Sequence, residues 1–159
     1  MTSRAPTTIT LEPGATDFYA RTLQILADAQ VPKRMIDLIH SAGAKVFHHN
    51  DGAILRILPD MVEAGIDILN PIQWRCRDMD RKMLKERFGK KLVFHGGMDN
   101  QETLAFGTVA DVRREAEENI AIFGHTRFIL APCHNIQAVS PPENIVAMYE
   151  TGYQLGWQQ

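Results

Sequence analysis

The sequence predicts an α/β fold in which short parallel strands alternate with helices. Four short apolar runs recur along the chain, at residues 44–48, 66–69, 91–95 and 128–131. Each run is followed by a polar turn and then by a segment with helical periodicity. Such alternation is typical of parallel strands joined by right-handed crossovers. The runs are almost continuously apolar, as expected for strands that are covered on both faces.

Composition excludes several classes of protein. The 159 residues are 45% hydrophobic and 23% charged, with a formal net charge of −2 and no basic stripe, so a nucleic-acid partner is not expected. No apolar window approaches the roughly 20 residues of a membrane helix, and the N-terminus lacks the apolar core of a secretory signal. Two cysteines, Cys76 and Cys133, make no disulfide framework, which predicts a cytoplasmic protein.

Two helices are expected before the first strand. Residues 1–15 are rich in Thr, Pro and Gly without periodicity, and we interpret them as a loose tail that precedes a domain over 16–159. A helical pattern runs from Asp17 to about Gln30, where Pro32 interrupts it. A second helical stretch covers Met35–His40.

Four further helices alternate with the strands. The first three are expected over residues 53–65, 80–88 and 108–124, each ending at or just before a glycine. Thr108 and Asp111 have the spacing of a capping box. The last helix is expected to open at Ser140, with Pro142 in the first turn and Glu143 completing a second capping box. These four units, with their leading helix, suit either a small open α/β domain or part of a barrel, since a complete barrel needs eight units.

Chemistry in either fold collects after the carboxyl ends of the strands. His49 and Asp51 follow the first strand two residues apart, and Cys133 follows the fourth. Imidazole, carboxylate and thiolate together can hold zinc with one open position, so the three form a candidate metal site. The same His49 and Asp51 would otherwise only bond the loop backbone and cap the next helix. Cys133 and His134 are adjacent, and neighbouring residues of a strand point to opposite faces, which disfavours their direct pairing as nucleophile and base.

A second group of residues is predicted to bind substrate. Asn70 and Gln73 follow the second strand and offer amides that can orient a carboxylate or an amide. His95, Gly97 and Asp99 lie at the end of the third strand, where paired glycines let the backbone approach a ligand closely. A tight turn would need the same residue types, so both interpretations stay open.

Five stretches of the chain together resemble the uroporphyrinogen decarboxylase superfamily. They are Lys45–Gly52, Asp67–Gln73, Phe94–Asp99, Ile129–Ile136 and Ser140–Ile145. Their order and spacing follow the C-terminal half of the family over residues 17–156. The resemblance implies a TIM barrel, of which the four units form the C-terminal half.

The resemblance implies one of two activities. The decarboxylases remove carboxylates from a tetrapyrrole in porphyrin biosynthesis without a cofactor. Their histidine in a Gly-His-Gly turn falls at His134, the expected catalytic residue, although Cys133 and Asn135 replace the glycines. The alternative is a zinc-dependent methyltransferase that works with a methyl-corrinoid partner. Its His-x-Cys pair and later Cys correspond to His49 and Cys133, with Asp51 in place of the pair's thiolate.

The same resemblance places key substrate-binding groups in an N-terminal half that the chain does not contain. Two strand edges are therefore expected to be unpaired. Weak stability, a homo-oligomer or pairing with a separately encoded N-terminal half would follow. A third hypothesis is thus an inactive fragment, or a subunit that needs such a partner.

Overall fold

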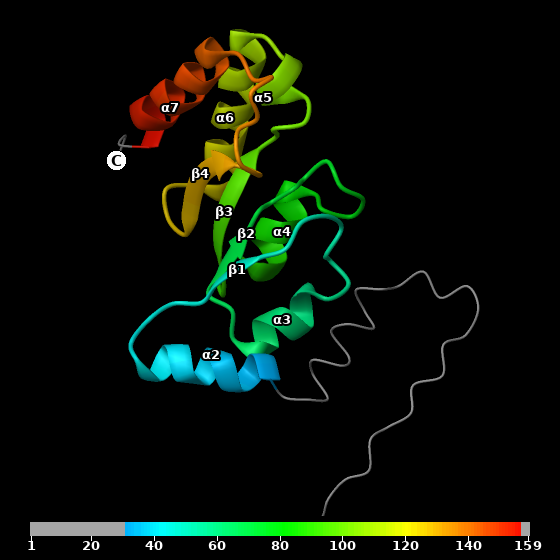
Figure 1. The fold of residues 1–159 in the computed structure, drawn as a ribbon, viewed down its shortest axis with the longest axis vertical. Coiled ribbons are helices and arrows are strands. Elements are labelled where there is room, and N and C mark those ends of the chain that lie inside the picture. Colours follow the sequence, from blue (N-terminus) through cyan, green and yellow to red (C-terminus); the bar gives the residue numbers. More distant parts are fainter. Residues whose placement is uncertain (1–30, 157–159) are drawn as a thin grey trace, which may run out of the picture.

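The computed structural model describes residues 31–156, and it confirms an α/β fold with parallel strands. Four strands form one sheet in the order β1-β2-β3-β4, and every neighbouring pair is parallel. The strands are β1 (Phe47–His49), β2 (Ile68–Asn70), β3 (Val93–Met98) and β4 (Phe128–Pro132). The helices are α2 (Val31–Ser41), α3 (Leu58–Ala64), α4 (Arg81–Phe88), α5 (Thr103–Phe106), α6 (Val109–Phe123) and α7 (Pro142–Gly156). Figure 1 shows the chain proceeding from α2 at one end, through the sheet, to α7 at the other.

A proline lies at the start of the helix that follows β1. This helix starts at Leu58 and not near Ala53, with Pro59 in its first turn, where the N–H that proline lacks has no helical partner. The helix predicted over Met35–His40 lies within α2.

The two predicted capping boxes differ in outcome. Thr108 and Asp111 form theirs at the start of α6, where each side chain accepts a backbone N–H of the other residue. The box predicted at Ser140 and Glu143 is wrong. The Ser140 hydroxyl is buried without a hydrogen-bond partner among the described residues, and α7 begins two residues later at Pro142.

The two faces of the sheet have different surroundings. Leu69, Phe94 and Met98 point to the face that the helices cover, and each is fully buried. Residues one position along point to the opposite face. There, Phe47 is 50% exposed and Ile129 is 45% exposed. The helices among residues 31–156 therefore cover only one face, and the carboxyl ends of the strands border the other face, called the open face below.

The predicted tail at 1–15 and the predicted helix at 17–30 lie outside the described residues. Within 31–156, no helix is both long enough and apolar enough to span a bilayer.

Candidate functional site

Three polar side chains lie next to one another on β1, β2 and β3. His49 and Asn70 end their strands, and His95 lies within β3, which runs on to Met98. The strand register pairs His49 with Asn70, and the Asn70 side chain reaches His95 on the next strand. Side chains paired in register on parallel strands point to the same face. Here that is the face not covered by the described helices, so the three strands present an imidazole–amide–imidazole row to the open face of the sheet.

Hydrogen bonds determine which nitrogen of His49 is available to a ligand. The Asn70 amide N–H donates to His95 Nδ1 at 2.7 Å, and Asn70 Oδ1 lies 2.5 Å from His49 Nδ1. Because Oδ1 can only accept, His49 carries its proton on Nδ1. Burial lowers the pKa of His95, which agrees with a neutral ring that accepts from Asn70. Nε2, the other ring nitrogen of His49, is therefore the one available to a ligand.

That nitrogen belongs to a group of three potential metal ligands. Ligand atoms of His49, Asp51 and His134 all lie within 4.8 Å of one another. His49 Nε2 is 3.3 Å from Asp51 Oδ2. Two ligands of a tetrahedral zinc ion, each about 2.1 Å from the metal, lie about 3.4 Å apart. The His49–Asp51 pair therefore has the spacing of two zinc ligands, and His134 lies close enough to complete the set by a small side-chain movement. Asp51 and His134 come from loops after two different strands.

The cluster opens onto a cavity on the same face of the sheet. The cavity has a volume of about 380 Å³, and its lining includes Phe47, His49, Asn70, His95, Cys133 and His134. The side chains of His49 and Asp51 are 50% and 43% exposed. A ligand can therefore reach the metal-binding atoms without any rearrangement of the strands.

The structure does not bring the Cys133 thiol into the ligand group. Cys133 is 2% exposed, and its Sγ donates to the Ile72 carbonyl oxygen at 3.1 Å. Burial raises the pKa of this thiol to about 12, so it stays protonated at neutral pH. Of the three predicted ligands, the structure brings His49 and Asp51 together, and the third member of the group is His134 where Cys133 was predicted.

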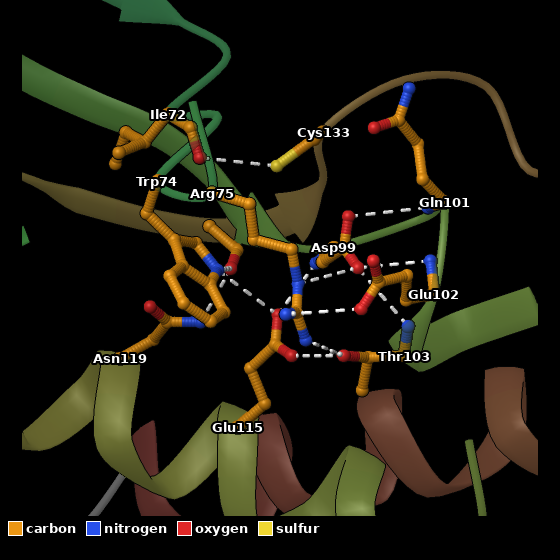
Figure 2. A network of polar contacts seen from close by, with 11 residues as sticks. Ile72, Trp74, Arg75, Asp99, Gln101, Glu102, Thr103, Glu115, Asn119 and Cys133 are labelled. Carbon is orange, nitrogen blue, oxygen red and sulfur yellow. Dashed lines mark hydrogen bonds and ion pairs between the residues drawn. The ribbon is translucent and has the colours of Figure 1, made fainter. Parts of the chain in front are cut away.

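Asp99, predicted to bind substrate, is fully engaged with its own chain. Its carboxylate accepts the backbone N–H groups of Gln101, Glu102 and Thr103 and pairs with Arg75 Nε at 2.8 Å (Figure 2). These bonds hold the turn at Gln101 and Glu102 and satisfy the first amide of α5, the short and unpredicted helix that follows. Asp99 lies outside the lining of the described cavities, and its contacts are those of a structural residue.

Glu115 extends this network into the interior. It is 6% exposed and accepts from the Asp99 backbone N–H at 2.6 Å, from Thr103 Oγ1 at 2.5 Å and from Trp74 Nε1 at 3.3 Å (Figure 2). Burial raises the pKa of Glu115 although these three donors favour its ionised form. The network joins the end of β3 to helices α5 and α6.

Gly97 supplies a backbone carbonyl to the same network. Its oxygen accepts from Trp74 Nε1 at 3.1 Å and from Asn119 Nδ2 at 2.8 Å. Gly97 has φ +90°, and a Cβ there would lie 3.1 Å from the Asn119 amide, which explains the glycine without reference to a ligand. Gly97, like Asp99, lies outside the lining of the described cavities.

A second cavity adjoins His134 and Asp51. Its volume is about 630 Å³, and its lining includes Gln73 together with Asn100, Gln101 and Gln137. Gln73 Oε1 accepts the Gly52 backbone N–H at 2.5 Å. The last three carboxamides are absent from the residues predicted to bind substrate. Their position after β3 and β4 was the only sequence signal available.

Comparison with known proteins identifies the family. A family model described as uroporphyrinogen decarboxylase matches residues 28–155. The chain belongs to the uroporphyrinogen decarboxylase family. A solved structure of a methyltransferase from Methanosarcina mazei is 25% identical, with a TM-score of 0.63, over 77% of this chain and 35% of that one. No curated protein matches the chain.

The family assignment also fits the architecture. This uroporphyrinogen decarboxylase family member has four parallel βα units in sequential order, as expected for part of a TIM barrel. It spans about a third, 35%, of the length of the methyltransferase that it resembles.

Proposed function

We propose that this chain is the metal-carrying part of a corrinoid-linked methyltransferase, with zinc held by His49, Asp51 and His134. The observation that carries the proposal is the group of three ligand atoms within 4.8 Å of one another at the open strand ends. The methyltransferase named among the solved structures supports the same branch of the family. Zinc and a methyl-corrinoid partner are accordingly the proposed cofactor and partner, and the cytoplasm is the proposed location.

The donor set suits the binding of a thiol. Two neutral imidazoles and one carboxylate leave a bound Zn²⁺ with a net charge of about +1 and one open position. When bound, zinc would lower the pKa of a substrate thiol and hold the thiolate. His49 contributes Nε2, Asn70 keeps the proton on His49 Nδ1, and the adjoining cavity gives the substrate access.

Methyl transfer from methylcobalamin to a small thiol tests the proposal. The thiolate would form a C–S bond while the Co–C bond breaks, leaving its electron pair on cobalt as cob(I)alamin. Under anaerobic conditions, zinc-loaded protein should produce cob(I)alamin absorbance, and His49→Ala protein should lose this activity. Folded, zinc-loaded protein that leaves methylcobalamin intact would contradict the assignment.

Decarboxylation of a tetrapyrrole is the second candidate. The description of the matching family model favours it, and so does His134, which occupies the place of the family's histidine and borders both cavities. In this reaction the chain would need no cofactor, and His134 would act on the substrate. Release of carbon dioxide from uroporphyrinogen, lost in His134→Ala, would favour it over methyl transfer.

A chain that works only with a complementary half is a third candidate. Strands β1 and β4 form the edges of the described sheet, and the face between them leaves Phe47 and Ile129 about half exposed. A second copy or a separate N-terminal half would cover these groups. A cooperative monomer in light scattering and thermal melting would contradict this requirement.

A further inference from the structure

His95 is the one imidazole of the imidazole–amide–imidazole row that does not belong to the metal-ligand group. That group consists of His49, Asp51 and His134. His95 lines the same cavity as His49, and its Nδ1 accepts a hydrogen bond from the Asn70 amide. Any influence of His95 on the metal site would therefore pass through Asn70.

The Asn70 amide needs a hydrogen-bond partner at each end. Asn70 is 8% exposed, so leaving either end of its amide unpaired would be costly. Its oxygen lies 2.5 Å from His49 Nδ1, and its nitrogen lies 2.7 Å from His95 Nδ1. An amide oxygen only accepts and an amide NH₂ only donates. One of the two flanking imidazoles therefore has to donate, and the other has to accept.

Two arrangements of the amide meet this requirement, and they have opposite effects on His49. In the observed arrangement, His49 donates from Nδ1 and His95 accepts at Nδ1, which leaves His49 Nε2 for a metal. If the amide were turned over, His95 would donate and His49 would accept at Nδ1. A neutral His49 would then carry its proton on Nε2, where the proton blocks coordination.

The surroundings of His95 favour its role as the acceptor. Burial lowers the pKa of His95, so at neutral pH its ring is neutral and keeps a lone pair on one nitrogen. The Phe47 ring packs against it with centroids 5.1 Å apart and planes at 75°, which limits rotation of the His95 ring. On the other side, the register partner of His95 is Ile129, whose side chain has no hydrogen-bonding group.

We propose that His95 is a positioning residue for the metal site. By accepting from the Asn70 amide, it keeps His49 in the tautomer whose Nε2 can bind zinc. The effect passes through Asn70, so His95 needs no contact with the metal. The purpose of this arrangement rests on the proposed function, whereas the order of the hydrogen bonds is a property of the metal-free protein.

The tautomers of the two histidines in metal-free wild type test the order of the hydrogen bonds. Nitrogen-15 NMR should show His95 protonated on Nε2 and His49 protonated on Nδ1. A neutral His95 that carries its proton on Nδ1 would overturn the proposal, because the Asn70 amide would then face the other way.

Two substitutions of His95 separate positioning from packing. His95→Leu removes the acceptor, so zinc affinity should fall about 10–100-fold while His49 becomes a mixture of tautomers. His95→Gln can turn its own amide so that the oxygen accepts from Asn70, and it should restore both the zinc affinity and the His49 tautomer.

A matched control completes the comparison. His125→Leu makes the same change at an exposed histidine and should alter neither property. Circular dichroism first confirms that the variants are folded. Wild-type zinc affinity in His95→Leu, or no recovery in folded His95→Gln, would overturn the positioning role.

The same spectra distinguish failure of this inference from failure of the proposed function. Folded wild type that binds no zinc, with a His49 tautomer that is lost in His95→Leu and kept in His95→Gln, would remove the metal site and preserve the positioning role. Zinc binding and a His49 tautomer that are both unaffected by His95→Leu would preserve the metal site and remove the positioning role.

Discussion

Two polar clusters lie at the same edge of the sheet, and they differ in how completely their atoms are bonded. Around Asp99 and Glu115, each carboxylate accepts several hydrogen bonds from the chain itself. Around His49 and His134, the side chains are exposed, and His49 Nε2 has one long contact, to Asp51 at 3.3 Å. Saturated groups stabilise the loops, while groups with free lone pairs can bind a ligand. Both clusters follow the carboxyl ends of strands, so position in the sequence does not tell a structural cluster from a binding cluster.

The largest expected effect is on the alkylation rate of the Cys133 thiol, which is buried although it follows a strand next to His134. Its pKa, raised by burial from 9.0 to about 12, reduces the thiolate fraction at pH 8 about a thousandfold. Iodoacetamide should therefore modify Cys133 about a thousandfold more slowly in folded protein than in urea, as measured by peptide mass spectrometry. Fast modification of Cys133 in folded protein would show that its thiol is accessible and would make Cys133 a candidate metal ligand again.

Removal of Glu115 should lower the stability of the protein through the cluster around Asp99 and Glu115, without affecting the cluster around His49 and His134. Glu115→Ala leaves the Asp99 N–H and the Thr103 hydroxyl without their acceptor, while the Trp74 N–H keeps the Gly97 carbonyl. We expect a loss of about 3 kcal/mol in the free energy of unfolding. Urea denaturation followed by circular dichroism measures it. Glu117→Ala, at an exposed position of the same helix, should change stability by less than about 0.5 kcal/mol.

Substitution of Asn70 should weaken zinc binding at the cluster of His49, Asp51 and His134, although Asn70 is not itself a proposed ligand. Asn70→Leu removes the acceptor that holds the proton on His49 Nδ1, so zinc affinity should fall about 10–100-fold. Nitrogen-15 NMR should show the Nδ1–H tautomer of His49 in wild type and a mixture of tautomers in the variant. Asn135→Leu, at an exposed position of the same cavity, is the control. Equal zinc affinity in wild type and Asn70→Leu would remove this role.

The smallest effect is expected at the opposite end of the strands, where Asp67 accepts from the Val46 N–H, Lys45 and His40. Burial raises the pKa of Asp67, but these partners outweigh it and lower the pKa from 3.8 to about 2. A carboxylate with a lowered pKa stabilises the fold above about pH 4, and that contribution is lost as the pH falls toward 2.

Thermal melting across this window tests the Asp67 contribution. Asp67→Asn should lower the melting temperature at pH 6 and flatten its decline between pH 4 and 2. Asp60→Asn, an exposed carboxylate in α3, should leave the profile unchanged. A profile for Asp67→Asn that parallels wild type would contradict the assignment.

The fold was largely predictable because its pattern is periodic. Alternating apolar runs and helices, glycines at helix ends and the capping box at Thr108 each have a local cause. The short helix α5 was not predictable, since it follows a turn that the carboxylate of Asp99 holds. Likewise, whether Ser140 caps α7 depends on how its hydroxyl is buried, which no local pattern encodes.

The site was predictable only in part, for a geometric reason. His49 and Asp51 lie two residues apart after one strand, and the structure brings them together. Cys133 and His134 are adjacent after the fourth strand, and the sequence does not indicate which of them supplies a ligand atom. The tertiary packing that buries Cys133 decides in favour of His134. The buried roles of Gly97 and Asp99 arise from contacts with α5 and α6 that are distant in sequence.

Zinc content after reconstitution tests the central claim most directly, with wild type, His134→Ala and Cys133→Ser measured side by side. Circular dichroism first confirms that all three are folded. The account predicts about one zinc per chain in wild type and Cys133→Ser, and a loss of zinc in His134→Ala. Zinc retained by His134→Ala but lost by Cys133→Ser would contradict the ligand set, and no zinc in folded wild type would contradict the metal site itself.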